Sequence, residues 1–433
     1  MGQRNTPQTA DDVLEHRDRA VLVGVDMGRA DWPIEESLAE LERLALTAEV
    51  DVVATATQRM DTANPKTFVG SGKIEEIAGL AGDFSANLVI FDDELTPSQQ
   101  LNIETLLPET RIIDRTALIL EIFAMHAVSR EGKLQVDLAQ QEYVLPRLRG
   151  MWGHLEKERL GGGRGARFGA GESQLESDRR MARKRIAHLK RELIAVANER
   201  DLQRKSRARS GMFRVALVGY TNAGKSTLLN ALTDAGVLQA DRLFATLDST
   251  TRRVALPEGR EITLTDTVGF INKLPHGLVE AFRSTLNEVN EADLQLHVTD
   301  ASSHQREQQM QAVREVLHEI DAHTGRSIVV FNKCDVLDSD DRLALRRRHP
   351  DAVFVSARTG EGLDALRARI SGEAAYGSVA LTVLVPYARG DLVALAHERG
   401  HILSEHHADD GTQLTVRVSA ELADAFAPFR FPD

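Results

Sequence analysis

The sequence is poor in cysteine and in aromatic residues, and it contains no long apolar run. Only one of its 433 residues is a cysteine, Cys334, and 5% are aromatic. A single cysteine excludes an internal disulfide and any metal site that needs several thiolates. The first 19 residues are polar, and no later segment is apolar over the roughly 18 residues that cross a bilayer. We therefore expect a cytoplasmic protein without a transmembrane segment and with at most a loose association with membranes.

Basic residues are in the minority, but they are concentrated in one part of the chain. The net charge of −12 argues by itself against binding to nucleic acid. Residues 147–209, however, contain 18 Lys and Arg against 8 Asp and Glu, a local balance of +10, so that the rest of the chain carries −22. Such a distribution predicts one basic surface for an anionic partner.

The length of the chain exceeds one ordinary core and predicts about three domains. The N-terminal part, residues 1–114, has the pattern of a small parallel α/β subdomain, because short β-rich runs alternate with helical patterns. The expected strands are residues 21–25, 51–56, 88–91 and 111–113, and the expected helices are residues 33–47, 74–81 and 97–106.

Two polar features of this subdomain have competing interpretations. Gly70-Ser71-Gly72-Lys73 resembles a phosphate loop but lacks the four-residue spacer, so we expect a turn and a helix start. The cluster Asp92-Asp93-Glu94 could hold a metal, but a solvated loop after a strand is the favoured interpretation.

Residues 115–210 are predicted to form a long antiparallel helical pair. Their side chains have the spacing of a narrow helical seam, at Leu134, Leu138, Gln141 and Leu145 in the first helix and at Ile186, Leu189, Leu193 and Val196 in the second.

The connection between these helices, residues 161–171, has six glycines in eleven residues. One interpretation is a disordered linker. We favour an RNA contact, because Arg164 and Arg167 can pair with phosphates and Phe168 can stack on a base. The sequence therefore predicts an arm whose tip binds RNA, and no DNA partner.

The most informative motif is Gly219-x-x-x-x-Gly224-Lys225-Ser226. An apolar run precedes it at residues 215–218, and an amphipathic helical start follows it. This strand, loop and helix context is typical of a phosphate-binding loop. The backbone N–H groups and the helix N-terminus face the anion, Lys225 reaches the terminal phosphates, and Ser226 offers a hydroxyl to Mg²⁺.

Residues 211–373 are expected to form the nucleotide-binding α/β domain around this loop. Its predicted strands are residues 214–218, 252–256, 261–265, 294–298, 328–331 and 353–355. A turn at residues 257–260 predicts one antiparallel edge strand on an otherwise parallel sheet. The rest, residues 374–433, predicts a small α+β domain with strands at residues 379–385 and 414–418 and helices at residues 390–400 and 420–426.

Further motifs identify the nucleotide as GTP. In Asp266-Thr267-Val268-Gly269, the Asp can hold Mg²⁺ through water and the Gly N–H can reach a γ-phosphate. In Asn332-Lys333-Cys334-Asp335, the carboxylate of Asp335 can accept two hydrogen bonds from guanine, whereas adenine would leave it unpaired. Ser356-Ala357-Arg358 follows the last strand, where a backbone N–H would meet the guanine O6.

A switch segment must also supply a hydroxyl to Mg²⁺ when the γ-phosphate is present. Thr246 is our choice, and spacing alone leaves Thr250 and Thr251 open. Many small GTPases have a Gln directly after Asp-x-x-Gly to orient the attacking water. Here that position is Phe270, so we expect slow hydrolysis by the protein alone.

The order of these motifs is that of translation-factor-class P-loop GTPases, and nearly the whole chain resembles the HflX family of ribosome-associated GTPases. The resemblance rests on residues 69–73, on Phe244-Ala245-Thr246-Leu247-Asp248, and on the glycine run preceded by Glu156-Lys157-Glu158-Arg159-Leu160. It implies that Thr246 is the switch ligand of Mg²⁺. It also implies binding to the large ribosomal subunit, stimulation by ribosomes, and a role in splitting or rescuing stalled or hibernating ribosomes.

The predicted fold is thus an α/β multidomain chain with a P-loop GTPase domain, and we expect a monomer. The predicted catalytic residues are Lys225, Thr246 and Gly269, and the predicted metal ligands are Ser226 and Thr246. The predicted nucleotide-binding residues are Gly219, Tyr220, Thr221, Asn222, Ala223, Gly224, Lys225, Ser226, Phe244, Ala245, Thr246, Leu247, Asp248, Asp266, Thr267, Val268, Gly269, Asn332, Lys333, Cys334, Asp335, Ser356, Ala357 and Arg358.

Two other functions compete with this interpretation. One is a nucleotide-gated RNA-binding or ribosome-assembly module in which hydrolysis only times release. The other, a metabolic kinase or an ATPase, is disfavoured by the guanine-selective residues 332–335.

Overall fold

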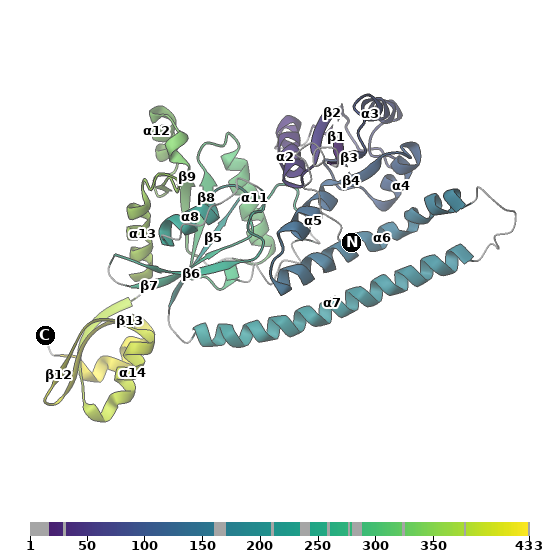
Figure 1. Ribbon diagram of the computed structural model, residues 1–433. Coiled ribbons are helices and arrows are strands. Elements are labelled where there is room, and N and C mark those ends of the chain that lie inside the picture. Colours follow the sequence, from purple (N-terminus) through teal and green to yellow (C-terminus); the bar gives the residue numbers. More distant parts are fainter. Residues whose placement is uncertain are drawn as a thin grey trace, which may run out of the picture. The chain divides into compact units, whose positions relative to one another are not determined.

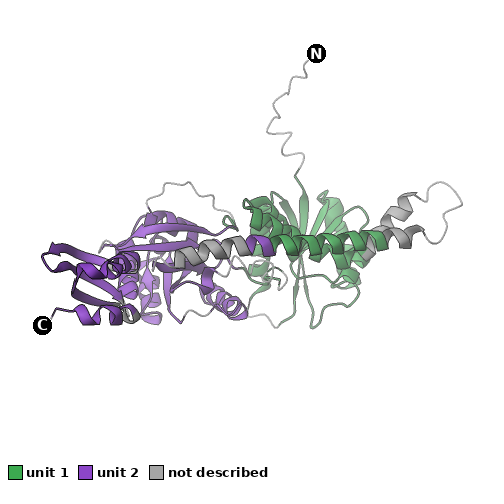
Figure 2. Cartoon of the chain, turned by 90° about the horizontal axis from the view of Figure 1, so that it is seen from below, with its two compact units in different colours: residues 1–193, 241–247, 271–282 green, residues 194–240, 248–270, 283–433 purple. Residues whose placement is uncertain are grey.

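The computed structural model describes residues 17–28, 32–159, 170–208, 212–233, 243–257, 260–275, 278, 288–322, 325–375 and 378–431. The chain divides into two compact units, which Figure 2 colours separately. Unit 1 comprises residues 1–193, 241–247 and 271–282, and unit 2 comprises residues 194–240, 248–270 and 283–433. Two short segments of the predicted GTPase domain therefore belong to unit 1, together with the N-terminal sheet.

Unit 1 contains a parallel four-stranded sheet with the order β2-β1-β3-β4, which confirms the predicted N-terminal α/β subdomain. Every residue of β3 is buried, as expected for an interior strand of a parallel sheet. The strands are β1 (Arg19–Asp26), β2 (Asp51–Arg59), β3 (Leu88–Phe91) and β4 (Arg111–Asp114). The helices are α2 (Ile34–Thr47), α3 (Ser71–Asp83), α4 (Pro97–Leu106) and α5 (Arg115–His126).

Local signals fix where two of these helices begin. Thr96 and Gln99 form a capping box at the start of α4. Asp114 caps α5 by accepting a hydrogen bond of 2.9 Å from the N–H of Ala117. Helix α5 therefore begins directly after β4, and it packs on α2 and on the sheet. The four-part division of the chain stays a prediction.

Two long helices, α6 (Arg130–Arg159) and α7 (Ala170–Ala208), run antiparallel in Figure 1, as predicted. Ion pairs join them: Arg185 pairs with Asp137, and Lys190 pairs with Glu142 at 2.8 Å. Helix α6 also packs on α4 and α5. The spacing of the predicted seam residues did not indicate this contact. Of the predicted seam residues, Leu138 and Leu189 are buried.

Unit 2 contains a six-stranded sheet with the order β10-β9-β8-β5-β7-β6. Only β6 is antiparallel, and it forms one edge, as the turn at residues 257–260 predicted. The strands are β5 (Phe213–Gly219), β6 (Thr250–Ala255), β7 (Glu261–Asp266), β8 (Leu294–Asp300), β9 (Ser327–Asn332) and β10 (Val353–Phe354). The helices are α8 (Lys225–Thr233), α11 (Arg306–Glu319), α12 (Ser339–Arg348) and α13 (Leu363–Ala375).

The C-terminal residues form an antiparallel three-stranded sheet with the order β11-β13-β12. Its elements are β11 (Ser378–Val385), α14 (Gly390–Arg399), β12 (His401–Ala408), β13 (Gly411–Ser419) and α15 (Ala420–Phe426). The sequence prediction missed β12. A register shift between Ile402 and Ser404 breaks the alternation that identifies a strand, and most side chains of β12 are exposed.

Among the helices that the structure describes, none combines the length and the hydrophobicity needed to cross a membrane.

Candidate active site

The phosphate-binding loop connects β5 to α8 and depends on two glycines. Gly219 has φ +156°, and a Cβ there would lie 2.1 Å from the carbonyl oxygen of Val298 on β8. Gly224 has φ +86°, and a Cβ there would lie 2.3 Å from Nδ2 of Asn332. Both distances are far below any real Cβ contact, so only glycine fits at either position. The loop passes this close because β8 and β9 end at the same edge of the sheet as β5.

Lys225 is the first residue of α8, and it is buried. Its Nζ donates hydrogen bonds to the carbonyl oxygens of Gly219 at 3.1 Å and Tyr220 at 3.0 Å. Burial lowers the pKa of Lys225 to about 8, and the negative charge of Asp266 partly opposes this decrease. A phosphate oxygen could replace these carbonyl acceptors and would stabilise the charged form of the amine.

The Asp-x-x-Gly motif leaves the carboxyl end of β7 and lies against the phosphate loop. Asp266 is buried, and Thr267 donates its hydroxyl to the carbonyl oxygen of Leu217 at 2.7 Å. The N–H of Thr221 donates to the carbonyl oxygen of Phe270 at 2.7 Å, and the N–H of Phe270 donates to that of Gly219 at 3.1 Å. The structure thus brings together two motifs that stand some forty residues apart in the chain.

Gly269 packs tightly in the same place. A Cβ there would lie 2.8 Å from the Cα of Thr221 and 3.1 Å from Nζ of Lys225. The backbone of Gly269 therefore lies directly against the phosphate loop, and its contact with a γ-phosphate stays a prediction.

Asn332, at the end of β9, joins two other loops. Its Nδ2 donates to the carbonyl oxygen of Ala223 at 2.9 Å, and its Oδ1 accepts from the N–H of Ala357 at 3.0 Å. One buried side chain therefore connects the phosphate loop to the Ser356-Ala357-Arg358 loop. Sequence reasoning assigned Asn332 to the nucleotide but did not find this connecting role, because motif spacing does not show which loops a side chain joins.

Asp335, the predicted reader of guanine, has a side chain that is 12% exposed. A hydrogen bond from Ser356 is the main cause that lowers its pKa, and the neighbouring Arg358 lowers it further. Both partners keep the carboxylate ionised, which is the state that accepts hydrogen bonds from N1–H and N2–H of guanine. Lys333 is held beside it by an ion pair of 2.8 Å with Asp300. Cys334 is buried, in agreement with a spacer role.

Thr246, the predicted switch residue, lies in unit 1. Leu243, Phe244 and Leu247 are buried, whereas Thr246 between them is partly accessible. The alternative Thr251 lies on β6, where its hydroxyl is 2.9 Å from that of Thr265. The assignment of the switch hydroxyl to Thr246 stays a prediction.

The donors fit Mg²⁺ by their chemistry. Ser226 and Asp266 in unit 2 offer a hydroxyl and a carboxylate, the hard oxygen ligands that Mg²⁺ prefers together with phosphates and water. Within the part of the chain that the structure describes, no cluster of three His, Cys, Asp or Glu side chains could hold a metal by itself.

The acidic cluster at the end of β3 corrects a prediction. We expected Asp92-Asp93-Glu94 to be a solvated loop, with a metal site as the alternative, but Asp92 is completely buried. Its carboxylate forms ion pairs with Arg115 of α5 and with Lys273 at 2.6 Å. Together Arg115 and Lys273 lower the pKa of Asp92 against the effect of burial, which is the largest cause and raises it. The sequence analysis did not identify Arg115 or Lys273 as a partner of Asp92. The position of Arg115 at the start of an apolar helix was a signal that could have indicated its burial.

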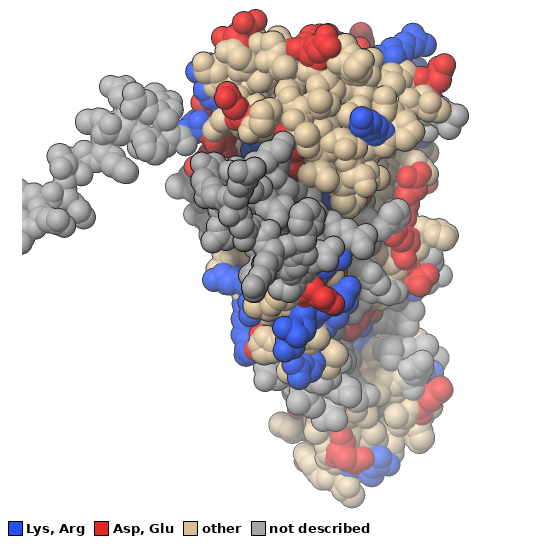
Figure 3. Space-filling view, turned by 90° about the vertical axis from the view of Figure 1, so that its right-hand side faces the viewer, with Lys and Arg blue, Asp and Glu red and all other residues tan. Residues whose placement is uncertain are grey.

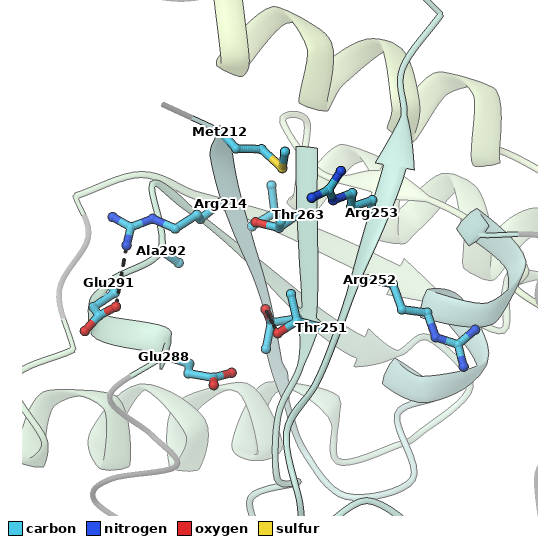
Figure 4. A pocket seen from close by; sticks show the side chains of 11 residues that line it. Met212, Arg214, Thr251, Arg252, Arg253, Thr263, Glu288, Glu291 and Ala292 are labelled. Atoms are coloured by element: carbon cyan, nitrogen blue, oxygen red, sulfur yellow. Dashed lines mark hydrogen bonds and ion pairs between the residues drawn. The ribbon is translucent and has the colours of Figure 1, made fainter. Parts of the chain in front are cut away.

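A cavity of about 280 Å³ lies on the face of the unit 2 sheet that does not carry α8 (Figure 4). On β7, Thr263 and Thr265 line this cavity, whereas the alternating Ile262 and Leu264 pack in the core with leucines of α8. Thr251 also points into it. Among the described lining residues none belongs to the nucleotide motifs, so we assign no nucleotide to this cavity.

The described cations of α7 include a paired group and an exposed group. Arg185 and Lys190 pair with carboxylates of α6. Arg180, Arg183 and Lys184 follow the i, i+3, i+4 spacing of one helix face, and they are exposed. No carboxylate of a described residue forms an ion pair with these three. Figure 3 shows a cluster of Lys and Arg side chains near the middle of the face it draws, with others scattered over that face. The predicted RNA contacts Arg164, Arg167 and Phe168 lie outside the described residues.

Three family models match the chain in succession. They are described as GTP-binding GTPase N-terminal (residues 35–124), GTP-binding GTPase Middle Region (residues 126–207) and 50S ribosome-binding GTPase (residues 214–333). The protein named GTPase HflX of Lacrimispora saccharolytica is 44% identical to this chain over 423 residues, which cover 96% of this chain and 98% of that protein.

The protein of the same name from Escherichia coli is 44% identical over 390 residues, which cover 88% of this chain and 90% of that protein. A solved structure of a GTP-binding protein from the hyperthermophilic archaeon Sulfolobus solfataricus in complex with GDP is 25% identical. It covers 82% of this chain and 98% of its own, with a TM-score of 0.44.

Proposed function

Because the chain belongs to the HflX family of GTPases and is a GTP-hydrolysing enzyme, we propose that it acts on the ribosome: it binds the large subunit and splits or rescues stalled or hibernating particles. Two observations support this proposal. One family model that matches residues 214–333 is described as a 50S ribosome-binding GTPase. The second is the basic arm, whose exposed cations on α7 are suited to the phosphates of ribosomal RNA.

The geometry of the phosphate loop is the observation that carries the nucleotide chemistry. Lys225 would exchange its two carbonyl acceptors for oxygens of the β- and γ-phosphates, and the backbone N–H groups of the loop would bind the same anion. Gly269 would direct its N–H to the γ-phosphate. Asp335 would select guanine, held in its ionised form by Ser356 and Arg358.

Ser226 and Thr246 would hold Mg²⁺, with Asp266 acting through water, and the metal would neutralise charge on the phosphates. Phe270 has no group that can orient water. The attacking water must therefore be positioned by another group, which agrees with an enzyme that is slow alone and is activated on its ribosomal partner.

A sucrose-gradient experiment tests the proposed action on ribosomes. Purified 70S particles are mixed with the protein and with GTP, GDP or a non-hydrolysable analogue of GTP. We expect subunits to separate with GTP and with the analogue but not with GDP, and the protein to sediment with the large subunit. If 70S particles only retain the protein, the nucleotide-gated RNA-binding module is the better description.

If the protein does not sediment with either particle in any nucleotide state, the ribosomal proposal is wrong. The GTPase activity would stand even then, because it rests on a separate site and on separate relatives. A Lys225→Ala variant is the matched control, since it should lose the effect of GTP while its arm stays intact.

A further inference from the structure

Strand β6 forms an edge of the six-stranded sheet in unit 2, and its outer side is open. The strand order places only β7 beside it. Among the described residues, no backbone group of β6 forms a hydrogen bond outside its ladder with β7. The strand at the opposite edge, β10, has only two residues, whereas β6 has six. Of these two edges, β6 is therefore the one long enough to pair with a further strand.

The register of the ladder shows which backbone groups of β6 face outward. The N–H of Leu256 donates to the carbonyl oxygen of Arg260 at 2.8 Å, and these two residues extend the β6–β7 ladder by one pair. Hydrogen-bonded and non-hydrogen-bonded pairs alternate along an antiparallel ladder. Positions 250, 252 and 254 therefore bond to β7, and the residues between them direct their N–H and C=O groups to the open edge. These residues are Thr251, Arg253 and Ala255.

The side chains agree with this register. The hydroxyl oxygens of Thr251 and Thr265 are 2.9 Å apart, as expected for a non-hydrogen-bonded pair, where opposite side chains lie closest. The side chains of Thr251, Arg253 and Ala255 are all exposed. The open edge thus presents a donor and an acceptor at every second residue, with a repeat of about 6.8 Å.

This alternation favours a peptide over RNA as the partner of the edge. Phosphate oxygens only accept hydrogen bonds, so they could not pair with the outward carbonyl groups. None of the described residues that line the adjacent cavity is aromatic, so no side chain among them can stack on a base. An extended peptide carries both donors and acceptors with the same repeat and can satisfy both kinds of group.

Two adjacent arginines give this edge a positive charge. Arg253 has a side chain that is 73% exposed, and it lies 3.7 Å from the exposed Glu261, an ion pair that contributes little. The side chain of Arg252 points away from that of Thr251 (Figure 4), and its Nη1 lies 3.5 Å from the hydroxyl of Thr233 on α8. Strand β6 itself contains no acidic residue.

This charge distinguishes between two possible occupants of the edge. A second copy of the chain that paired through β6 would bring the arginines of both copies close together, and like charges on paired strands are destabilising. A strand with acidic side chains would gain attraction at the same positions. The edge is therefore suited to an acidic segment of another protein.

We propose that β6 is a docking edge for an extended acidic peptide segment of a partner protein, which adds antiparallel to the sheet as its seventh strand. The backbone of the segment bonds to Thr251, Arg253 and Ala255, and one of its acidic side chains lies opposite Arg253. The cavity of about 280 Å³ that Thr251 and Arg253 line accepts a side chain projecting over this face. This inference does not depend on the proposed action on ribosomes.

Peptide binding to the full-length chain tests the proposal. The probe is a labelled, capped octapeptide of alternating Glu and Val, followed by fluorescence anisotropy with saturating GDP in every sample. An octapeptide of alternating Lys and Val is the probe of opposite charge. Arg253→Glu reverses the charge of the edge. The matched control is Arg347→Glu, since Arg347 on α12 is also exposed and has no described ion pair.

The wild-type chain should bind the Glu-Val peptide more tightly than the Lys-Val peptide. Arg253→Glu should weaken binding of the Glu-Val peptide roughly fivefold or more and should strengthen binding of the Lys-Val peptide, because each cross-strand charge pair changes sign. Arg347→Glu should bind both peptides as the wild type does. If the Glu-Val peptide does not bind at about 1 mM, or if Arg253→Glu binds both peptides like the wild type, the proposal is wrong.

A backbone variant separates strand addition from simple charge attraction. Ala255→Pro removes one outward N–H but no hydrogen bond of the ladder with β7. It should weaken binding of the Glu-Val peptide about fivefold while GDP affinity stays unchanged. A decamer of uridine is tested in parallel. If Ala255→Pro binds the peptide normally, or if the RNA binds more tightly than the peptide, the edge is not a peptide-docking site.

Modified peptides cover the case in which Ala255→Pro does not fold. In an antiparallel addition with Glu opposite Arg253, the N–H groups of the Glu residues bond to β6 and those of the Val residues point away. A peptide N-methylated at its Glu residues should therefore lose binding, whereas one N-methylated at its Val residues should bind like the parent peptide. Equal binding of the two methylated peptides overturns the proposal. No ribosome is present in these assays, so their outcome is independent of the gradient experiment.

Discussion

Asn332 and Asp335 belong to one tetrapeptide, yet they perform different tasks. Asn332 points inward and connects the phosphate loop to the loop that contains Ala357. Asp335 stays at the surface of the site and is kept ionised by Ser356 and Arg358. The first residue therefore builds the site, and the second one is predicted to read the base.

This difference predicts the effect of Asp335→Asn. An amide can donate to a carbonyl where the carboxylate cannot, so the variant should bind GTP more weakly and should accept xanthosine triphosphate. We expect selectivity for guanine over xanthine to fall by at least about a hundredfold, because an unpaired polar group at a base edge carries large discrimination. Competition binding with labelled GDP measures this, and unchanged selectivity would remove Asp335 from base recognition.

The pKa of Lys225 predicts how GTP binding depends on pH. Burial lowers this pKa to about 8, from an ordinary value of 10.5. Below pH 8 the amine is already charged and ready for a phosphate, whereas above it GTP can bind only if a proton is taken up. Affinity for GTP should therefore fall as the pH rises above 8, by up to roughly tenfold for each unit.

Calorimetry in buffers of different ionisation enthalpy provides the measurement. Proton uptake on GTP binding should be small at neutral pH and should rise toward one proton per site in the alkaline range. If no proton is taken up at any pH above 8, the amine keeps its charge in the free protein.

At the scale of the element, the order of the strands assembles the site. Strands β5, β7, β8, β9 and β10 are parallel, so their carboxyl ends meet at one edge of the sheet. The phosphate loop follows β5, and the Asp-x-x-Gly motif follows β7. The two loops predicted to contact guanine, at residues 332–335 and 356–358, follow β9 and β10. Binding at the carboxyl ends of such strands is a general rule of open α/β sheets.

The arm is the second element with a task of its own. Some cations of α7 form ion pairs with α6, and others are exposed. An anionic partner can therefore bind the exposed cations without disrupting the ion pairs between the two helices. We predict that the Arg164→Ala, Arg167→Ala double variant binds large ribosomal subunits more weakly and with a flatter salt dependence. Each lost contact with a phosphate of single-stranded RNA changes the slope of log K against log salt concentration by about 0.7.

Co-sedimentation across a salt series measures this effect, and GTP affinity should be unchanged. A truncated chain that begins at Gly211 serves as the comparison. If the truncated chain binds subunits as tightly as the full chain, the anchor lies in the GTPase or C-terminal domain.

At the scale of the whole molecule, charge and catalysis are separated along the chain. The basic excess of +10 lies in residues 147–209, and the remaining chain carries −22. The remainder should be repelled by RNA phosphates, so binding to a ribosome should be directed by the arm. The GTPase motifs lie outside this basic stretch. Binding of the arm to an anionic partner can therefore change the rate of hydrolysis only if the arm and the GTPase domain are coupled.

This separation, together with Phe270, predicts slow turnover by the free protein. A phenyl ring cannot orient water, so the rate should rise at least about a hundredfold when large subunits supply or position the missing group. Phosphate release at saturating GTP is measured with and without subunits. Equal rates would mean that the chain already contains its own water-orienting group.

Much of the candidate site could be predicted from the sequence, because its motifs are short and have fixed spacing. Gly219 to Ser226, Asp266 to Gly269 and Asn332 to Asp335 each follow a strand, and each motif was placed on the correct strand end. The parallel sheets, the antiparallel edge strand β6 and the long helical pair were also predicted, since apolar periodicity and turn residues are local signals.

Contacts between distant residues were decided by the tertiary structure alone. Asp92 and Lys273 are 181 positions apart, and the sequence shows only an acidic cluster and a lysine. Burial made Asp92 of that cluster the ion-pair partner of two cations and not part of a solvated loop, because a buried carboxylate needs a cation and folding supplied two. Strand β12 was missed for a related reason, since a bulge and exposed side chains erased its local period. Sequence determines what local geometry and composition can encode; which distant groups share one buried site is fixed only when the chain packs.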